Sequence, residues 1–171
     1  MTTSSLVVDS PVGPLVLADT EGRLSGLRLP HVAEDGTRSA APLQQWQPVR
    51  RPTRLLQQAV DELAAYFAGE LTQFELPLQL GGTPFQLRVW QALREIPFGA
   101  TATYGELAEQ LGSSGASRAV GLASNRNPVP IIVPCHRVIG AGGGLVGFGG
   151  GLACKRWLLD HESAGDQLFT L

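Results

Sequence analysis

The chain has 171 residues, of which 43% are hydrophobic, and its formal net charge is −2. This length suits one large domain or two small ones, with enough apolar residues to bury a core. The slight negative charge excludes a protein coated in cations for gripping polyanions. The charge is uneven, however, because residues 1–83 hold six Lys/Arg against nine Asp/Glu, and residues 84–163 hold seven against five. A mildly basic second half is compatible with nucleic-acid contact through a few placed arginines.

The N-terminus shows no pattern of an export signal. The stretch MTTSSLVVDSPVG lacks a cationic region followed by a hydrophobic segment of signal-peptide length, and apolar runs elsewhere are only a few residues long. We therefore expect a cytoplasmic protein with no membrane partner. The two cysteines, Cys135 and Cys154, are expected to stay reduced, because thiols remain unpaired in a reducing compartment.

The first part of the chain predicts an antiparallel meander and one helix. Residues 5–29 alternate short β-type runs with Pro and Gly turn signals, which predicts three strands. Residues 31–52 show no sustained period and are expected to form an exposed loop, with Trp46 pinning it to the core. Apolar residues then recur at helical spacing from an N-cap at Thr53 to a stop at Gly69. This helix is expected to cover the sheet, and residues 74–80 form one more extended segment.

The sequence GGTP at residues 81–84 is typical of a hinge to a second unit. A helix capped by Thr83 is expected next, ending at Pro97. Two short helices follow around a glycine-bearing turn, the second starting from Ser117 as N-cap. This order is that of a helix-turn-helix, whose second helix faces nucleic acid and would place Arg118 there. The alternative is a helical hairpin with no DNA partner.

A cysteine, a histidine and an arginine stand side by side in NPVPIIVPCHRVI, residues 127–139. Pro134 ends a run of β-branched residues and is expected to turn Cys135 outward, so that the thiol is displayed. A reactive cysteine acts as the thiolate, which needs a base or positive charge to lower its pKa from about 8.5. His136 and Arg137 are the candidates. Neighbours on an extended segment point to opposite faces, so His136 would reach the thiol only through a bridging water.

The third member of such a relay is a carboxylate that holds the imidazole. The segment KRWLLDHE at residues 155–162 supplies Asp160 and Glu162 at the end of an expected helix, and spacing alone leaves both open. The alternative for Cys135 itself is a small buried hydrophobe.

Two further motifs were weighed and neither fits. Cys135, His136, Cys154 and His161 contain zinc-ligand types, but the last two lie two turns apart on one helix, roughly 10 Å of rise, too far to share an ion. We therefore predict no metal site. The glycines of GAGGGLVGFGGG form a formal G-x-G-x-x-G, yet no strand-helix-strand unit surrounds them. A tightly turned loop that lets a substrate approach the backbone fits this segment better.

RAVGLASNRNPVPIIVPCHRVIG followed by GGLACKRWLLDHE closely resembles the O6-alkylguanine-DNA alkyltransferases, also called methylated-DNA–protein-cysteine methyltransferases. The resemblance runs without an obvious gap from about Thr83 to Glu162, and its Pro-Cys-His-Arg-Val core with an upstream Asn-Pro-x-Pro is highly specific. It implies an α/β N-terminal domain over residues 1–82, ribonuclease-H-like, with an antiparallel sheet and a helix. It also implies a mainly helical winged helix-turn-helix domain over residues 83–171.

The resemblance implies a DNA repair protein that works once and needs no cofactor. It would flip O6-alkylguanine, and also O4-alkylthymine, out of duplex DNA and move the alkyl group irreversibly to Cys135, because a base inside the stack is inaccessible. By the family pattern, His136 acts through water as the base for Cys135, and Glu162, rather than Asp160, orients it. Arg137 is expected to make a structural pair and Cys154 to pack in its helix. Self-association along DNA is left open.

The same resemblance assigns the groups around the lesion. Tyr104 would donate a hydrogen bond to guanine N3, offsetting the charge that develops as O6 leaves. Val138 and Cys135 would offer backbone carbonyls to the guanine amino group, and Asn127 would brace the turn below the site. The helix at about 117–126 would enter the minor groove with Arg118 in place of the flipped base. Further DNA contacts are expected from Ser117, Ala119 and Arg126, although a solvated surface arginine is the alternative at the last position.

The sequence departs from the family pattern at two positions of the glycine-rich loop. Phe148 stands where a tyrosine is usual, and Gly149 where a serine or alanine is usual. Both are expected near the alkyl pocket, where the loss of a hydroxyl and a side chain would leave room for bulkier alkyl groups.

Two rival functions remain at this stage. One is a non-catalytic sensor of the alkyltransferase-like type, which binds and flips the lesion; such proteins lack the cysteine, so Cys135 favours chemistry. The other is a cysteine hydrolase built on Cys135 and His136, which would turn over an ester or amide.

Overall fold

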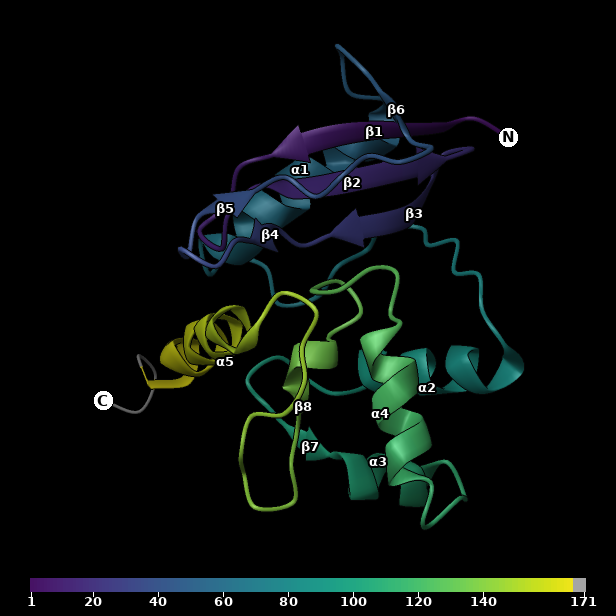
Figure 1. Ribbon diagram of the computed structural model, residues 1–171, viewed down its shortest axis with the longest axis vertical. Helices are drawn as coiled ribbons and strands as arrows, with labels where there is room; N and C mark the ends of the chain where they lie inside the picture. The colour runs from purple at the N-terminus through teal and green to yellow at the C-terminus, as the bar shows by residue number, and fades with distance from the viewer. Residues whose placement is uncertain (168–171) are drawn as a thin grey trace. The chain divides into compact units, whose positions relative to one another are not determined.

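The computed structural model describes residues 1–167 and forms two compact units, Met1–Leu80 and a second that begins at Gly81 (Figure 1). No helix among the described residues is long and apolar enough to cross a bilayer.

The first unit is a small sheet with a helix on one face. Strands β1 (Thr3–Val8), β2 (Leu15–Thr20) and β3 (Arg23–Arg28) form the predicted antiparallel meander, in the order β3-β2-β1-β6. Every residue of β2 is buried, as befits a central strand. Helix α1 (Arg54–Phe67) packs on the sheet, and the side chain of Thr53 caps it as predicted.

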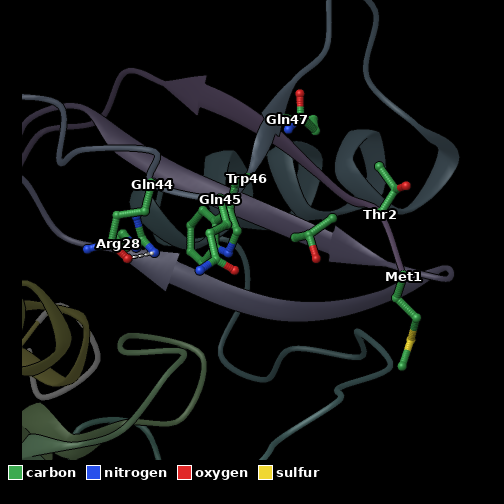
Figure 2. Close-up of a pocket in the computed structure, with 8 residues that line it drawn as sticks. Met1, Thr2, Arg28, Gln44, Gln45, Trp46 and Gln47 are labelled. Carbon is green, nitrogen blue, oxygen red and sulfur yellow. Dashed lines mark hydrogen bonds between the residues drawn. The ribbon is translucent and has the colours of Figure 1, made fainter.

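Residues 31–52 are more ordered than the sequence predicts. Two short strands, β4 (His31–Val32) and β5 (Arg38–Ser39), pair with each other, and β6 (Gln47–Pro48) adds to the sheet beside β1. The periodicity of two-residue strands is too short to detect. Trp46 does anchor this segment: a Cβ placed on Gly26 would lie 2.6 Å from its indole ring, and the guanidinium of Arg28 lies 3.7 Å from its ring centroid (Figure 2).

The extended segment predicted at residues 74–80 forms only an isolated bridge between Leu78 and Leu24. Proline and the polar residues that flank it leave too few consecutive backbone groups for a longer ladder.

The second unit is mainly helical. Helix α2 (Pro84–Arg94) starts with a full capping box, in which Thr83 and Gln86 exchange side-chain and backbone hydrogen bonds. Helices α3 (Tyr104–Gln110) and α4 (Ser117–Asn125) pack on each other, and α4 also packs on α2. The buried indole of Trp90 donates to the carbonyl of Ala123 at 2.9 Å, which ties α2 to α4.

The structure corrects the predicted start of α4. Ala116, not Ser117, occupies the N-cap, and no side chain caps the helix. The turn before it, closed by a hydrogen bond from Ala116 N to Ser113 O, brings the chain into helical position one residue earlier. The first intrahelical bond therefore ends on the Ala116 carbonyl, and Ser117 is already helical.

Three elements complete the second unit. The 3-10 helix η1 (Cys135–Arg137) is followed by β8 (Val138–Ile139), which pairs in parallel with β7 (Ala102–Thr103). Helix α5 (Leu152–Gln167) packs on η1 and continues beyond the end at residue 161 that the sequence predicts. The chemistry-bearing motif thus lies on a short turn between the α2–α4 layer and α5.

Candidate active site

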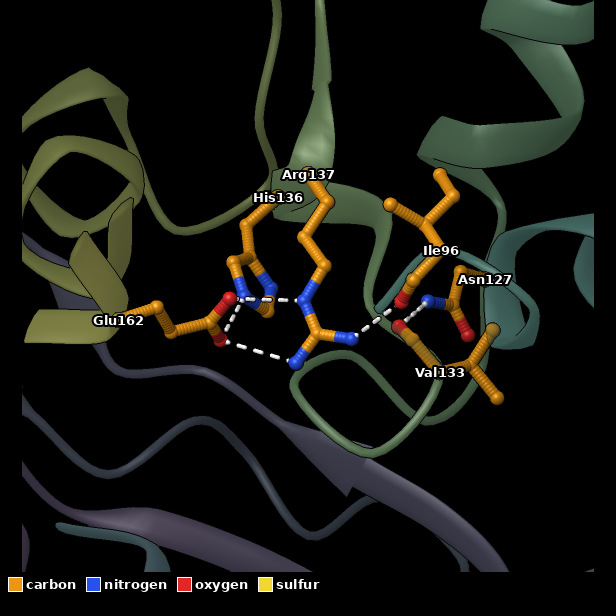
Figure 3. A network of polar contacts seen from close by, with 6 residues as sticks. All are labelled: Ile96, Asn127, Val133, His136, Arg137 and Glu162. Carbon is orange, nitrogen blue, oxygen red and sulfur yellow. Dashed lines mark hydrogen bonds and ion pairs between the residues drawn. The ribbon is translucent and has the colours of Figure 1, made fainter. Parts of the chain in front are cut away.

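The turn that leads into the cysteine is held by Asn127. Its side chain donates to the carbonyl of Val133 at 2.7 Å and accepts from the amide of Val129 at 2.9 Å (Figure 3). Between these contacts Ile131 adopts a left-handed backbone with φ of +74°. This conformation is strained for a β-branched residue, and it persists because the surrounding bonds fix the turn. The structure therefore places Asn127 where it fixes the approach to Cys135.

Cys135 is not displayed as predicted. It begins a 3-10 helix that is closed by a hydrogen bond from Arg137 N to Pro134 O, and only 8% of its surface is exposed. The sequence suggested an extended segment after Pro134, but a proline also fits the residue before a helical turn. Cys135 and His136 therefore do not alternate across a strand.

His136 and Glu162 form the buried pair of the site. Nε2 of His136 lies 2.6 Å from Oε2 of Glu162, and neither side chain is more than 1% exposed. Asp160, the alternative carboxylate, is exposed on α5. Nδ1 of His136 is also buried and has no hydrogen-bond partner among the described residues. This nitrogen is the one that remains available for a proton from the thiol side.

Arg137 braces the same carboxylate from the other direction (Figure 3). Its Nε donates to Oε1 of Glu162 at 2.7 Å and its Nη2 to Oε2 at 3.1 Å, while Nη1 donates to the carbonyl of Ile96 at 2.6 Å. A bidentate guanidinium of this kind fixes both the position and the charge of its partner. The predicted structural pairing of Arg137 is confirmed.

These contacts set the protonation states of the pair. Burial raises the pKa of Glu162, but hydrogen bonds and charge from His136 and Arg137 outweigh burial and lower it to about 2. Burial lowers the pKa of His136, and Glu162 offsets part of that effect. An ionised carboxylate can only accept, so Nε2 of the neutral imidazole carries the hydrogen and Nδ1 presents a lone pair. The imidazole is thereby poised as a base.

The thiol itself is protonated in the free protein. Burial raises the pKa of Cys135 to about 11, although a hydrogen bond from Asn127 and the charge of Lys155 lower it in part. Tyr104, at the start of α3, is half-buried, and its hydroxyl donates to the carbonyl of Val146 at 3.4 Å. Burial and the nearby Cys135 raise the pKa of Tyr104, which keeps the phenol a donor.

Sequence reasoning missed Lys155. Its side chain is fully buried, and its ammonium donates to the carbonyl of Val146 at 2.9 Å. The missed signal is positional: on α5 the spacing places it on one stripe with Leu158 and Glu162, both buried. A lysine on the buried stripe of a helix is rarely structural padding.

The other predicted residues lie around this centre or on the surface. Val138 is buried directly after the 3-10 helix, Phe148 is half-buried and Gly149 is exposed in the loop before α5. On α4, the exposed side chains include Arg118 and Ala119, with Arg126 at its C-terminal cap, while Ser117 is half-buried. Within the described residues, no group of three or more His, Cys, Asp or Glu could hold a metal ion.

Fold and site together define a class of protein: a sheet-and-helix unit joined to a helical unit with a buried cysteine beside a histidine–glutamate pair. Residues 5–80 match the family model described as 6-O-methylguanine DNA methyltransferase, ribonuclease-like domain, and residues 84–164 match its DNA binding domain.

Known proteins agree. A methylated-DNA–protein-cysteine methyltransferase of Mycobacterium bovis is 51% identical over 92% of this chain and 90% of its own length. One of Methanosarcina acetivorans is 46% identical over 92% of this chain and 97% of its own. The crystal structure of Mycobacterium tuberculosis OGT in complex with DNA superposes with a TM-score of 0.85, at 49% identity over 95% of this chain and 94% of that one.

The chain belongs to the 6-O-methylguanine DNA methyltransferase family. The family resemblance and the predicted fold class are thereby confirmed.

Proposed function

We propose that this protein repairs alkylated DNA by direct reversal, taking the alkyl group from O6 of guanine, and also from O4 of thymine, onto Cys135. The observation that carries the proposal is the buried Cys135–His136 segment held by Glu162 inside a family of cysteine methyltransferases. The chemistry is a methylated-DNA–protein-cysteine methyltransferase reaction, in which the protein is its own acceptor.

The transfer begins with removal of the thiol proton. The proton leaves Sγ of Cys135 through a water molecule to Nδ1 of His136, whose other nitrogen is fixed by Glu162. The thiolate then attacks the alkyl carbon in line with the bond to O6. The carbon–oxygen bond breaks, a carbon–sulfur bond forms, and the guanine takes up the electron pair of the broken bond.

The leaving guanine needs stabilisation of its developing charge. Tyr104 is proposed to donate a hydrogen bond to N3, since its raised pKa keeps the hydroxyl protonated. Carbonyls of Val138 and Cys135 would accept from the guanine amino group, and Phe148 and Gly149 would border the alkyl group. Asn127 would keep the turn in place while the thiol reacts.

The DNA partner is proposed to be a duplex that contains O6-alkylguanine, bound through its minor groove by α4. The relative from Mycobacterium tuberculosis was crystallised with DNA, and the matched family model for residues 84–164 is a DNA binding domain. Arg118 is exposed in the first turn of α4 and long enough to fill the place of a flipped base, while Ala119 and Ser117 allow close approach. Arg126 would contact phosphate.

Three smaller proposals accompany the function. A thioether cannot be reversed by any group in the described site, so each chain would act once and need no cofactor. Reduced thiols and DNA repair fit a cytoplasmic location. Residues 1–82 and 83–171 are proposed as the two domains, with self-association along DNA left to the experiment.

One observation favours a second candidate, the lesion sensor. The thiol is buried, and its pKa is raised to about 11, as expected of a cysteine that only packs. The stoichiometry of repair separates the two functions. With protein held constant and lesion DNA increased, repaired lesions should plateau at one per chain. Binding without repair would establish a sensor, and continued repair beyond the plateau would establish a turning-over enzyme.

A further inference from the structure

Lys155 is the only lysine in the chain, which otherwise uses twelve arginines for its positive charges. Its side chain is fully buried, whereas the neighbouring Arg156 on α5 is exposed. An ammonium group is costly to bury and is almost never fully buried unless it is paired. A single lysine placed at a buried position therefore needs a partner that accounts for it.

The contacts of Lys155 converge on the reactive centre. Its Nζ donates to the carbonyl of Val146 at 2.9 Å, and the hydroxyl of Tyr104 approaches the same oxygen at 3.4 Å. One carbonyl of the glycine-rich loop thus joins α5 to the residue proposed to face the guanine. No carboxylate among the described residues pairs with this ammonium.

The charge of Lys155 acts on the thiol. It lowers the pKa of Cys135 against the effect of burial, and the thiol in turn raises the pKa of Lys155, which burial lowers. It also lowers the pKa of His136. The other titratable groups here contribute no free cation: Tyr104 is a neutral phenol, and Arg137 is bound to Glu162. Lys155 is therefore the positive charge that the site itself can offer a thiolate.

We propose that Lys155 is a positioning residue of the transfer reaction, whose ammonium fixes the Val146 carbonyl beside Tyr104 and stabilises the Cys135 thiolate. This inference rests on the proposed function. The proton of Cys135 still leaves through His136, so Lys155 stays protonated throughout and is neither acid nor base. An ammonium on a flexible stem suits this role, because it offers a compact charge to a single atom.

The charge is tested by replacing Lys155 in the full-length protein. Lys155→Met keeps most of the side-chain volume without the charge, and Lys155→Arg keeps the charge. The pKa of Cys135 is measured from thiolate ultraviolet absorbance against a Cys135→Ala baseline, and from iodoacetamide labelling mapped to the Cys135 peptide. The Met variant should raise the pKa by about one unit, and so lower the thiolate fraction about tenfold below the pKa. The Arg variant should stay closer to wild type.

Arg156→Met is the matched control, since it removes a cation from the same helix at an exposed position. It should leave the titration of Cys135 unchanged. A folded Lys155→Met variant whose thiol titrates like wild type would overturn the proposal, even if its transfer rate fell, because a purely structural lysine would give that result.

A second readout needs no substitution at Lys155. With one lysine in the chain, labelling with carbon-13 lysine gives a single side-chain ε-carbon NMR signal, which reports the pKa of Lys155 directly. Coupling between two sites is reciprocal, so Cys135→Ala should lower the pKa of Lys155 by about the same one unit. An unchanged lysine titration would contradict the proposal if the Met variant does not fold. Neither readout involves DNA, so this inference and the proposed alkyl transfer can fail separately.

Discussion

His136 and Glu162 meet at 2.6 Å, Nε2 to Oε2, at a point where both side chains are buried. Because Arg137 holds both oxygens of the same carboxylate, the imidazole can neither rotate nor exchange its hydrogen-bond partner without breaking the ion pair. The orientation of the base is therefore built into the fold before any DNA arrives.

Removing this carboxylate charge should cost both stability and reaction rate. Glu162→Gln leaves Arg137 buried without an anion, and we expect a loss of about 3 kcal/mol in the free energy of unfolding, measured by urea denaturation. The rate of methyl transfer should fall by at least tenfold, because the imidazole loses its orienting partner. Asp160→Asn is the matched control on the same helix and should change neither quantity. Equal effects of the two substitutions would contradict the assignment.

Acid should destabilise the protein in a range set by the same pair. The pKa of Glu162 falls from an ordinary 4.5 to about 2 on folding, so its contribution is complete above pH 4.5 and is lost as pH falls towards 2. The loss amounts to about 3 kcal/mol. His136, whose pKa is also lowered, removes further stability as pH drops below its ordinary value of 6.5. Urea denaturation across this range checks the prediction, and Glu162→Gln should flatten its lower part. Identical pH profiles for the two proteins would refute it.

The turn below the cysteine should depend on Asn127. Asn127→Ala removes two hydrogen bonds, to Val133 and Val129, from a segment that holds Ile131 in a strained conformation. We expect a loss of about 2 kcal/mol in the free energy of unfolding and a slower transfer reaction. Asn125→Ala, at an exposed position of α4, should cost less than about 0.5 kcal/mol. A stable Asn127→Ala variant would show that backbone packing alone maintains the turn.

Much of this arrangement follows from the sequence, and the exceptions have physical reasons. The three strands, the Thr53 and Thr83 caps and the Cys-His-Arg segment depend on neighbouring residues, which local patterns describe well. Asp160 and Glu162 are two positions apart on one helix, so only the packed face of α5 decides which of them meets His136.

The missed features depend on distant parts of the chain. Nothing in the letters around Ile131 announces a positive φ, since Asn127 imposes it through contacts across the turn. The burial of Cys135 likewise results from packing of α5 on the 3-10 helix, which no local period encodes. A sole lysine on an apolar stripe was visible in the sequence, but its meaning required the position of the Val146 carbonyl.

The loop residues Phe148 and Gly149 should set the range of alkyl groups. A Cβ at Gly149 would meet no atom within 4 Å, and its backbone is not left-handed, so Gly149→Ser should fold normally. If the missing side chain leaves room in the pocket, this variant should transfer benzyl groups several-fold more slowly relative to methyl groups. Single-turnover rates on O6-benzylguanine and O6-methylguanine duplexes provide the ratio, with Phe148→Tyr as a companion. Ratios unchanged in both variants would rule out a role of these positions in selectivity.

Arg118 should matter for duplex DNA and not for chemistry. Arg118→Ala is expected to slow transfer from a duplex at least tenfold, because no side chain replaces the flipped base. Transfer from free O6-benzylguanine, which needs no flipping, should stay at the wild-type rate. Arg156→Ala provides the control for loss of one positive charge. Equal loss on both substrates would place Arg118 in the fold of the site instead of on the DNA.

The central claim, that Cys135 accepts the alkyl group, is tested most directly by the intact mass of the protein. Wild type and Cys135→Ala are incubated with an excess of duplex that contains one O6-methylguanine. The account predicts that wild type gains the mass of a single methyl group, located on the Cys135 peptide, and that the Ala variant gains none. Wild type that binds the lesion without gaining mass, or a methyl group found on Cys154, would contradict it.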